Sequence, residues 1–207
     1  MRPADAGLTE PDFLAQVRRS PANTALLERL PALNLPDAWL AAGCLFQAVW
    51  NLRSGRAPDW GVQDHDVFYF DPTDLSPDAE ARTEARVRHA VADLGVVVEV
   101  KNQARVHTWY RDWFGADYPA LRCARDGIDR FLVAGTCVGI RLADSSLHAT
   151  HGLHDLAAGV LRMNPLHPMP ALFERKARSY QARWPWLRIV DVPESHSPPQ
   201  AAEHDLP

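Results

Sequence analysis

Two aspartates separated by one residue lie in a stretch of strand-forming residues. Asp64 and Asp66 belong to the segment Val62–Asp71, which is mostly β-branched or aromatic, a composition typical of β-strands. Because side chains alternate along a strand, we expect both aspartates on one face and His65 on the other. At ~4 Å between oxygens their repulsion is on the order of 4 kcal/mol. Such a pair suits a divalent cation; a polar edge strand with two solvated acids is the alternative.

A third acid, Glu99, stands alone in the apolar run Val96–Val100. A continuous β-branched run predicts a strand buried on both faces, where Glu is rare unless it is paired or coordinates a cation. Adjacent strands of a mixed sheet can place Glu99 beside the two aspartates. Three carboxylates would then face one pocket.

A helix is expected to precede the acidic strand. Residues 38–42 are apolar and fit either a buried strand or a helix, and Gly43 ends them. Apolar residues at 45, 48, 49 and 52 then recur at helical spacing. Gln47 and Asn51, four residues apart, fall together on a different side of that helix. Because Gly43 opens it, the first amides can meet a phosphate with no Cβ in the way.

Proline and glycine divide the rest of the chain into further expected elements. Ser76 and Pro77 start a helix that Gly95 stops, and Asp144-Ser145 turns between two strands. Expected helices cover 10–17, 23–33, 102–115, 119–132, 154–161 and 170–183; expected strands cover 136–142 and 147–150. The residues before 35 form N-terminal helices, and 193–207 are expected to be disordered. In the helix after Asn102, Trp109, Tyr110 and Trp113 are expected to be core.

Composition indicates one soluble domain. The 207 residues are 46% hydrophobic and 23% charged with a net charge of −4, so no strong nucleic-acid footprint is expected. No apolar run is long enough to span a membrane. Three separated cysteines without a CxxC pair fit a reducing cytoplasm.

The acids and Gly43 occur in an order that resembles the nucleotidyltransferases of the DNA polymerase β superfamily. The superfamily signature is a hydrophobic residue, Gly and a small residue at a helix start, then Asp-x-Asp on the next strand and a third acid on a later one. A closer resemblance is to an uncharacterised bacterial branch of the superfamily, over residues 35–187. The stretches that carry it are 42–44, 49–51, 64–71, 74–76, 99–110, 114–115, 138–141 and 152–156. Two departures are Cys44, where Gly or Ser is usual, and a longer spacer from Gly43 to Asp64.

The resemblance implies an α/β (α+β) fold: a mixed β-sheet flanked by helices, with added C-terminal helices at about 152–187. It implies transfer of a nucleotidyl group from an NTP to an unidentified acceptor hydroxyl, with release of pyrophosphate. Two Mg²⁺ ions, or Mn²⁺, would be held by Asp64 and Asp66. Glu99 would hold the first ion or accept the acceptor's proton. A catalytically inactive member that binds a nucleotide or a protein partner is the alternative.

Further polar residues are candidates for binding the nucleotide, beginning with Gly43 and Cys44 at the helix start. Lys101 shares the strand face of Glu99. Each of the others has a structural alternative: a cap for Asn102, Arg162 and Asn164, a salt bridge for Arg105, a satisfied histidine for His107, and a solvated lysine for Lys176.

Other site classes have little support in the sequence. His148, His151 and His154 match no structural zinc spacing. His65-Asp66 lies on a strand with its side chains facing opposite ways, unlike the helical His-Asp pair of HD phosphohydrolases. No Walker loop or GxGxxG is present.

Overall fold

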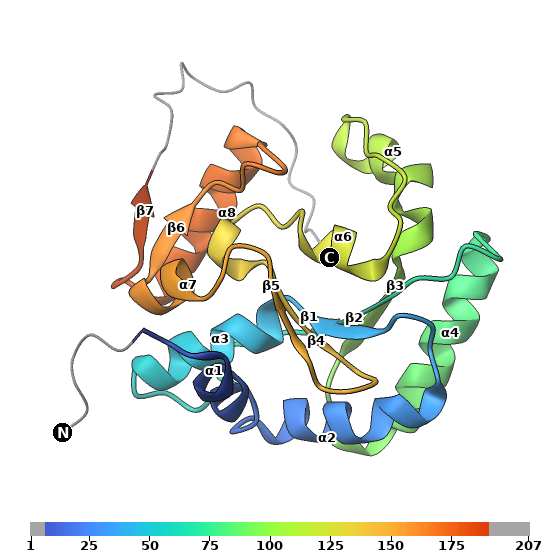
Figure 1. Cartoon of the computed structure of the whole chain (residues 1–207), viewed down its shortest axis with the longest axis horizontal. Coiled ribbons are helices and arrows are strands. Elements are labelled where there is room, and N and C mark those ends of the chain that lie inside the picture. The colour runs from blue at the N-terminus through green and yellow to red at the C-terminus, as the bar shows by residue number, and fades with distance from the viewer. Residues whose placement is uncertain (1–6, 191–207) are drawn as a thin grey trace.

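A mixed five-stranded sheet forms the centre of the protein. The computed structural model describes residues 7–190, and Figure 1 shows their arrangement. The sheet order is β3-β2-β1-β4-β5, in which β2 and β3 are parallel and the other neighbours antiparallel. This confirms the predicted mixed sheet. Its strands are β1 (Trp39–Ala41), β2 (His65–Tyr69), β3 (Val98–Asn102), β4 (Val138–Arg141) and β5 (Leu147–Ala149).

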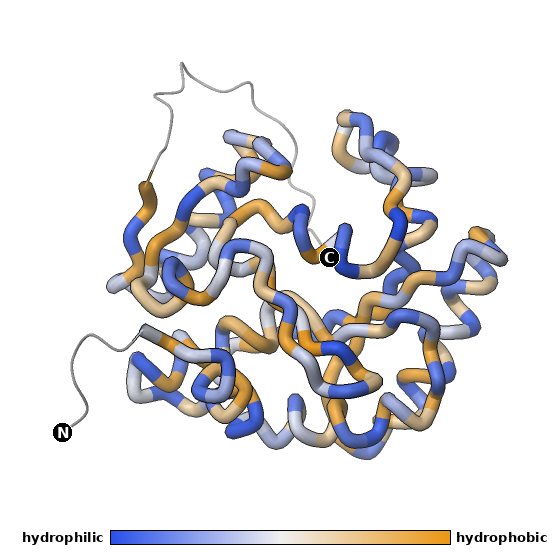
Figure 2. The backbone as a smooth tube through the Cα atoms, in the orientation of Figure 1, coloured by the Kyte–Doolittle hydropathy of each residue, from blue (hydrophilic) through white to orange (hydrophobic). Residues whose placement is uncertain are grey.

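One face of the sheet is the main hydrophobic core. On β2 and β3, Val67 and Val100 are fully buried on this face, and His65 and Tyr69 alternate onto it as expected for a strand. Helices α1 (Glu10–Val17), α2 (Pro21–Arg29) and α4 (Pro77–Ala90) cover it, and Figure 2 shows hydrophobic residues concentrated there. The side chains of Thr9 and Ser76 cap α1 and α4, and the predicted helix start at Ser76 is confirmed.

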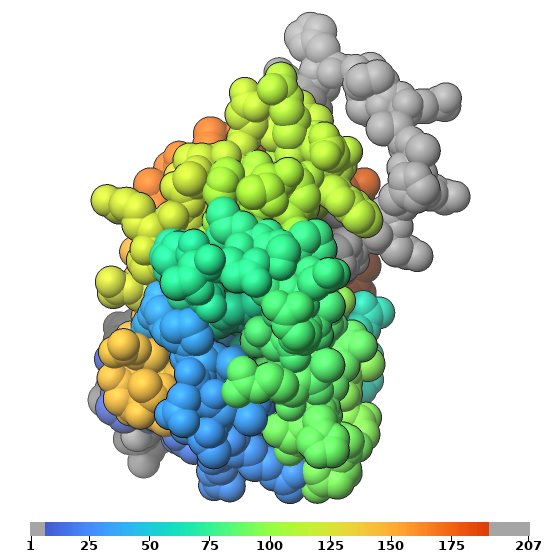
Figure 3. Space-filling view, turned by 90° about the vertical axis from the view of Figure 1, so that its right-hand side faces the viewer, coloured from blue at the N-terminus to red at the C-terminus, as the bar shows by residue number. Residues whose placement is uncertain are grey.

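The opposite face carries the acids and is only partly covered. Helix α6 (Ala124–Ile128) packs on Trp39 and Ala41 of β1. Its Ile128 occupies the space above Gly139 of β4, so the helix lies over the middle of the sheet. Seen from the β3 edge, the segment around α5 (Tyr110–Phe114) stands above α4 (Figure 3). The acids on β2 and β3 therefore face a region bordered by these segments.

The C-terminal part is attached to helix α3 (Gly43–Arg53). It contains α7 (His154–Ala158), β6 (Val160–Arg162), α8 (Pro170–Arg183) and β7 (Arg188–Val190). The indole of Trp184 donates to Asn51 at 2.9 Å, and the indole of Trp50 donates to the Leu156 carbonyl at 3.1 Å. The predicted helices at 154–161 and 170–183 are present as α7 and α8, and the part also contains a short parallel pair, β6 and β7, that was not predicted.

Several predicted boundaries also differ from the structure. The expected helix after Asn102 is a 3₁₀ helix, η3 (Gln103–Thr108), followed by α5, and only α6 forms within 119–132. Trp113 is 68% exposed rather than core, and Val97 is 56% exposed because β3 is an edge strand. The remaining 3₁₀ helices are η1 (Leu30–Leu33), η2 (Ala92–Leu94) and η4 (Ala134–Thr136). The predicted tail at 193–207 lies outside the described residues.

Within residues 7–190, the helices are all too short or too polar to cross a lipid bilayer.

Candidate active site

Three carboxylates lie on one face of the sheet where the parallel strands β2 and β3 pair. Asp66 lies opposite Glu99 in the register of the two strands, and Asp64 is two residues before Asp66, so all three occupy the face opposite Val67 and Val100. Each is half-buried. Among the described residues, none of these carboxylates has a hydrogen bond or an ion pair with another side chain. The strand pairing therefore gathers negative charge that no arginine or lysine neutralises directly.

The protonation of these acids reflects their crowding. Desolvation raises the pKa of Asp66 to about 7, and the charges of Asp64 and Glu99 act in the same direction. Desolvation and then the charge of Asp64 also raise the pKa of Glu99, against the opposing effect of Lys101. A cation bound between these acids would stabilise their ionised forms and so oppose both pKa shifts.

The start of α3 lies within the electrostatic reach of the same acids. Burial raises the pKa of the Cys44 thiol, and the charges of Asp66 and Asp64 add to that effect. The Cys44 Sγ is directed to the Ala41 carbonyl at 3.3 Å. Ala42, the residue before the helix, has φ 60° and ψ −135° and provides no side-chain cap. The amides of Gly43 and Cys44 therefore have no capping side chain, while the amide of Leu45 donates to the Ala42 carbonyl at 3.2 Å.

Gly43 has a tighter environment than expected. A Cβ at this position would lie 2.5 Å from Nε2 of Gln47, so the side chain of Gln47 covers the glycine. The contact of Gly43 with a phosphate stays a prediction. In the structure, the group that lies against the α-carbon of Gly43 is the carboxamide of Gln47.

Helix α8 contributes cationic and aromatic groups above the acids. Lys176 is exposed, yet desolvation and Arg183 lower its pKa, while Asp66 and Asp64 act to raise it. The half-buried Arg183 donates to Oε1 of Gln47 at 3.2 Å. Tyr180, which is buried, also interacts with the charges of Asp66 and Asp64. The structure thus brings the predicted Lys176 to the acids, together with two residues of α8 that the sequence did not indicate.

Lys101 also lies on the acidic face. It follows Glu99 by two residues on β3 and pairs in register with Phe68 of β2. Its charge opposes the pKa shifts of Asp66 and Glu99. This position agrees with the prediction that Lys101 shares the strand face of Glu99.

Asn102 and Arg105 lie on the other side of the sheet. The buried amide of Asn102 donates to the Asp71 carbonyl at 2.8 Å and its oxygen accepts from Ala104 at 3.1 Å. Arg105 forms a 2.7 Å ion pair with Glu80 of α4, with only 11% and 13% of the two side chains exposed. The structural alternative holds at both positions, since these groups connect α4, β3 and the loop after β2.

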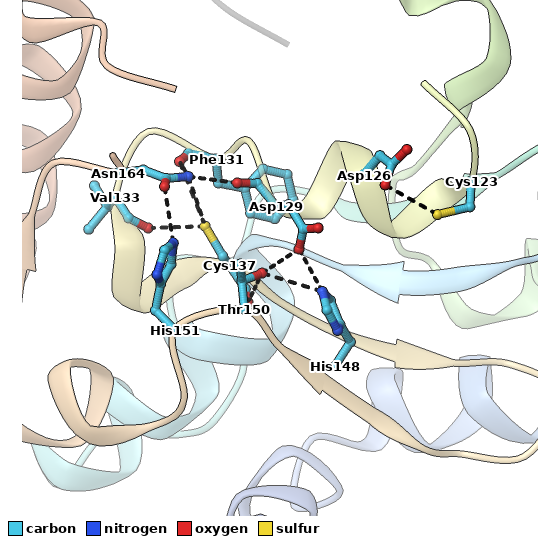
Figure 4. A network of polar contacts seen from close by, with 10 residues as sticks. All are labelled: Cys123, Asp126, Asp129, Phe131, Val133, Cys137, His148, Thr150, His151 and Asn164. Carbon is cyan, nitrogen blue, oxygen red and sulfur yellow. Dashed lines mark hydrogen bonds and ion pairs between the residues drawn. The ribbon is translucent and has the colours of Figure 1, made fainter. Parts of the chain in front are cut away.

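Three further candidates are not brought to the acids. Asn164 is fully buried, donates to the carbonyls of Asp129 and Phe131 at 2.7 Å each, and accepts from His151 (Figure 4). Arg162 is exposed on β6 and pairs with Asp155 at 3.2 Å. His107 is half-buried, and its Nδ1 has no partner in the part of the chain that the structure describes.

His148 and His151 form hydrogen bonds in the polar network that contains Asn164. His148 contacts the carboxylate of Asp129 at 2.6 Å, and Thr150 donates to that carboxylate at 2.5 Å (Figure 4). No group of three His, Cys, Asp or Glu side chains within residues 7–190 is arranged to hold a metal by itself.

Sequence reasoning missed Gln47 and Arg183 as site residues. Gln47 is 8% exposed although it lies off the apolar stripe of its helix. Its spacing of four from Asn51 was the available signal, because both side chains reach the end of α8. Arg183 is one of many arginines in a polar helix, and nothing in its local sequence separates it from the others.

A divalent cation of the Mg²⁺ type fits the acids if substrate completes its shell. Mg²⁺ is commonly held by one or two carboxylates together with water and phosphate oxygens, rather than by a cage made wholly of protein. Asp64, Asp66 and Glu99 offer hard oxygen donors, and the charges of Asp64 and Glu99 add to the desolvation that raises the pKa of Asp66, against the smaller effects of Lys176 and Lys101. A full protein cage is not formed, in agreement with the finding on three-residue groups.

Comparisons with known proteins agree with this architecture. A family model described as "Nucleotidyltransferase" matches residues 28–189. An NMR structure described as revealing a CCA-adding enzyme head domain is 27% identical to this chain with a TM-score of 0.69, and the match covers 87% of this chain and 95% of that one. Comparison with the curated proteins gave no significant match.

The mixed sheet and its flanking helices define a polymerase β-like α+β fold with an acidic site. The chain belongs to the nucleotidyltransferase family.

Proposed function

We propose that this protein transfers a nucleotidyl group from an NTP to an acceptor hydroxyl, with release of pyrophosphate and dependence on Mg²⁺ or Mn²⁺. The observation that carries the proposal is the register pairing of Asp66 with Glu99, with Asp64 on the same face. Three unpaired carboxylates are costly to gather unless a cation is bound there. The family match supports nucleotidyl transfer in general, and the ion and the products are part of the proposal.

The residues divide into groups with distinct roles. Asp64 and Asp66 would hold two ions, which when bound neutralise phosphate charge and lower the pKa of the attacking hydroxyl. Glu99 would share the first ion or accept the acceptor's proton, a role that its raised pKa favours. The amides at the start of α3 and the ammonium of Lys176 would orient the triphosphate.

The acceptor is proposed only as a hydroxyl compound. The similar structure is described as a CCA-adding enzyme head domain, which makes an RNA 3′ end one acceptor to test. The net charge of −4 weighs against a long RNA footprint, so small alcohols, aminoglycosides and protein hydroxyls belong in the same screen.

A calorimetric titration followed by an acceptor screen tests the proposal. The wild type should bind NTP in the presence of Mg²⁺, and Asp64→Asn with Asp66→Asn should abolish that binding. Pyrophosphate release with one acceptor class would then support transfer. If the double variant binds NTP·Mg²⁺ as well as the wild type, the metal site is refuted. Binding by the wild type without pyrophosphate release from any acceptor would support a catalytically inactive, nucleotide-binding protein instead.

A further inference from the structure

The side chain of Gln47 lies over the first turn of its own helix, α3. Only 8% of the residue is exposed, and its Nε2 occupies the position where a Cβ on Gly43 would collide at 2.5 Å. With glycine at position 43, the carboxamide can lie against the first turn; a larger residue there would displace it. Any ligand that approaches the uncapped amides of α3 meets this carboxamide as well.

The orientation of the carboxamide is determined by Arg183. Its Nη1 lies 3.2 Å from Oε1 of Gln47. An arginine can only donate hydrogen bonds, so the oxygen of Gln47 must face Arg183 and the nitrogen must face Gly43. The guanidinium is itself held against two rings, with its carbon 4.5 Å from the centre of Trp184 and 5.4 Å from that of Tyr180.

The two hydrogens on Nε2 have no acceptor in the part of the chain that the structure describes. The atom is not among the polar atoms sealed from solvent, so a ligand can reach it. Because Nε2 is open to solvent, water can accept its hydrogen bonds in the free protein, and an acceptor oxygen of a ligand can take the place of that water. Nε2 of Gln47 is therefore an available hydrogen-bond donor beside Gly43, at the start of the eleven-residue helix α3.

We infer that Gln47 binds the polyphosphate of the nucleotide through Nε2 and that Arg183 is the positioning residue that holds it in that orientation. This inference rests on the proposed function and names a contact for it. The ligand must be an acceptor, because Nε2 only donates, and it must be anionic to suit the amides of the helix N-terminus.

Cys44 offers a nucleotide phosphate no strong side-chain hydrogen-bond donor at the start of α3. Cys44, which follows Gly43, directs its Sγ to the Ala41 carbonyl at 3.3 Å. A thiol is also a weak hydrogen-bond donor. An amide N–H is a stronger donor than a thiol, so Gln47 is the better side-chain donor of the two at the start of α3.

Binding of tripolyphosphate in the presence of Mg²⁺ tests the inference by calorimetry. The variants are Gln47→Met, Arg183→Met and the double variant, since methionine keeps the length of glutamine without its donors. Gln181→Met on α8 is the matched control, because Gln181 donates to the Leu187 carbonyl and not toward Gly43. Thermal unfolding of every variant reports on the fold independently.

Gln47→Met should weaken tripolyphosphate binding about tenfold or more, the usual size of a hydrogen bond to a charged group, with an unchanged melting temperature. Arg183→Met should weaken it in the wild type but add little in the Gln47→Met background, because Arg183 acts through Gln47. Gln181→Met should bind as the wild type does.

Two results would overturn the inference. If the wild type binds tripolyphosphate and Gln47→Met binds it equally well, the inference fails while the proposed function stands. If the losses in Gln47→Met and Arg183→Met simply add, Arg183 acts on the ligand by itself and the positioning role fails. Absence of any binding by the wild type would refute the proposed function and this inference together.

Discussion

Asp66 has the most perturbed environment of the three acids. Its carboxylate lies between Asp64 and Glu99 on a half-buried sheet face, and its pKa is raised to about 7. The unfolded chain, where an aspartate titrates near 3.8, has no such crowding. The native state therefore resists ionisation of Asp66 in the absence of a cation.

This shift predicts a pH-dependent stability of the metal-free protein. Because the folded pKa exceeds the unfolded one, the wild type keeps its full stability below about pH 4 and loses it as the pH rises through about 7. Above that pH, Asp66→Asn should be more stable than the wild type by on the order of 4 kcal/mol. Urea unfolding in a chelating buffer measures the difference. An Asp66→Asn gain that stays constant between pH 4 and 8 would contradict the assignment.

Glu99 allows binding to be separated from chemistry. If it supplies the base or shares the first ion, Glu99→Gln should abolish transfer while NTP binding, held by Asp64, Asp66 and the α3 amides, remains. Pyrophosphate release and NTP calorimetry on the same preparation measure the two effects. Turnover that persists in this variant would remove Glu99 from the chemistry.

Arg105 shows how a plausible ligand-binding residue can be structural. Its buried ion pair with Glu80 predicts that Arg105→Met destabilises the protein by about 3 kcal/mol, with no change in NTP affinity. Arg82→Met, which breaks the exposed pair with Asp74, is the control and should cost under about 1 kcal/mol. A selective loss of NTP affinity in Arg105→Met, with stability unchanged, would restore Arg105 to the binding site.

At the scale of elements, the turn between β1 and α3 is the most constrained part of the site. Ala42 adopts φ 60° and ψ −135°, a region that is open to glycine and strained for alanine. This residue joins α3 to Ala41, which pairs in register with Asp66. The strained backbone of Ala42 therefore costs free energy at the turn that positions the start of α3.

Ala42→Gly should relieve that strain and stabilise the protein by about 1 kcal/mol, after the entropy cost of glycine is subtracted. Ala41→Gly, one residue earlier in the buried strand, should destabilise it instead. Thermal and urea unfolding of both variants give the comparison. If Ala42→Gly is as destabilising as Ala41→Gly, the turn is not strained in solution.

At the scale of the whole molecule, the site is assembled from parts that are distant in the sequence. The acids come from β2 and β3, the amides from α3, and the cations from α8 near the end of the described chain (Figure 1). Indole hydrogen bonds from Trp184 to Asn51 and from Trp186 to Ser54 attach the end of α8 to α3. The C-terminal part is thus a structural component of the site.

Local patterns in the sequence predicted the central strands, the long helices and the neighbouring positions of Asp66 and Glu99, because alternation and capping depend on nearby residues. They did not predict β6 and β7, which are three residues each and form only by pairing with each other. They also missed the contact of Gln47 with Arg183, since 136 positions separate the two. Arg105 and Asn102 were ambiguous because their partners, Glu80 and Asp71, lie on other elements.

The most direct test of the central claim is diffraction from crystals grown with Mn²⁺ and a non-hydrolysable NTP analogue, using the anomalous signal of the metal. We predict Mn²⁺ bound to carboxylate oxygens of Asp64 and Asp66, next to Glu99, with the analogue's phosphates completing the coordination. Crystals that contain the analogue but show no anomalous peak at these acids, or show the metal elsewhere, would contradict it.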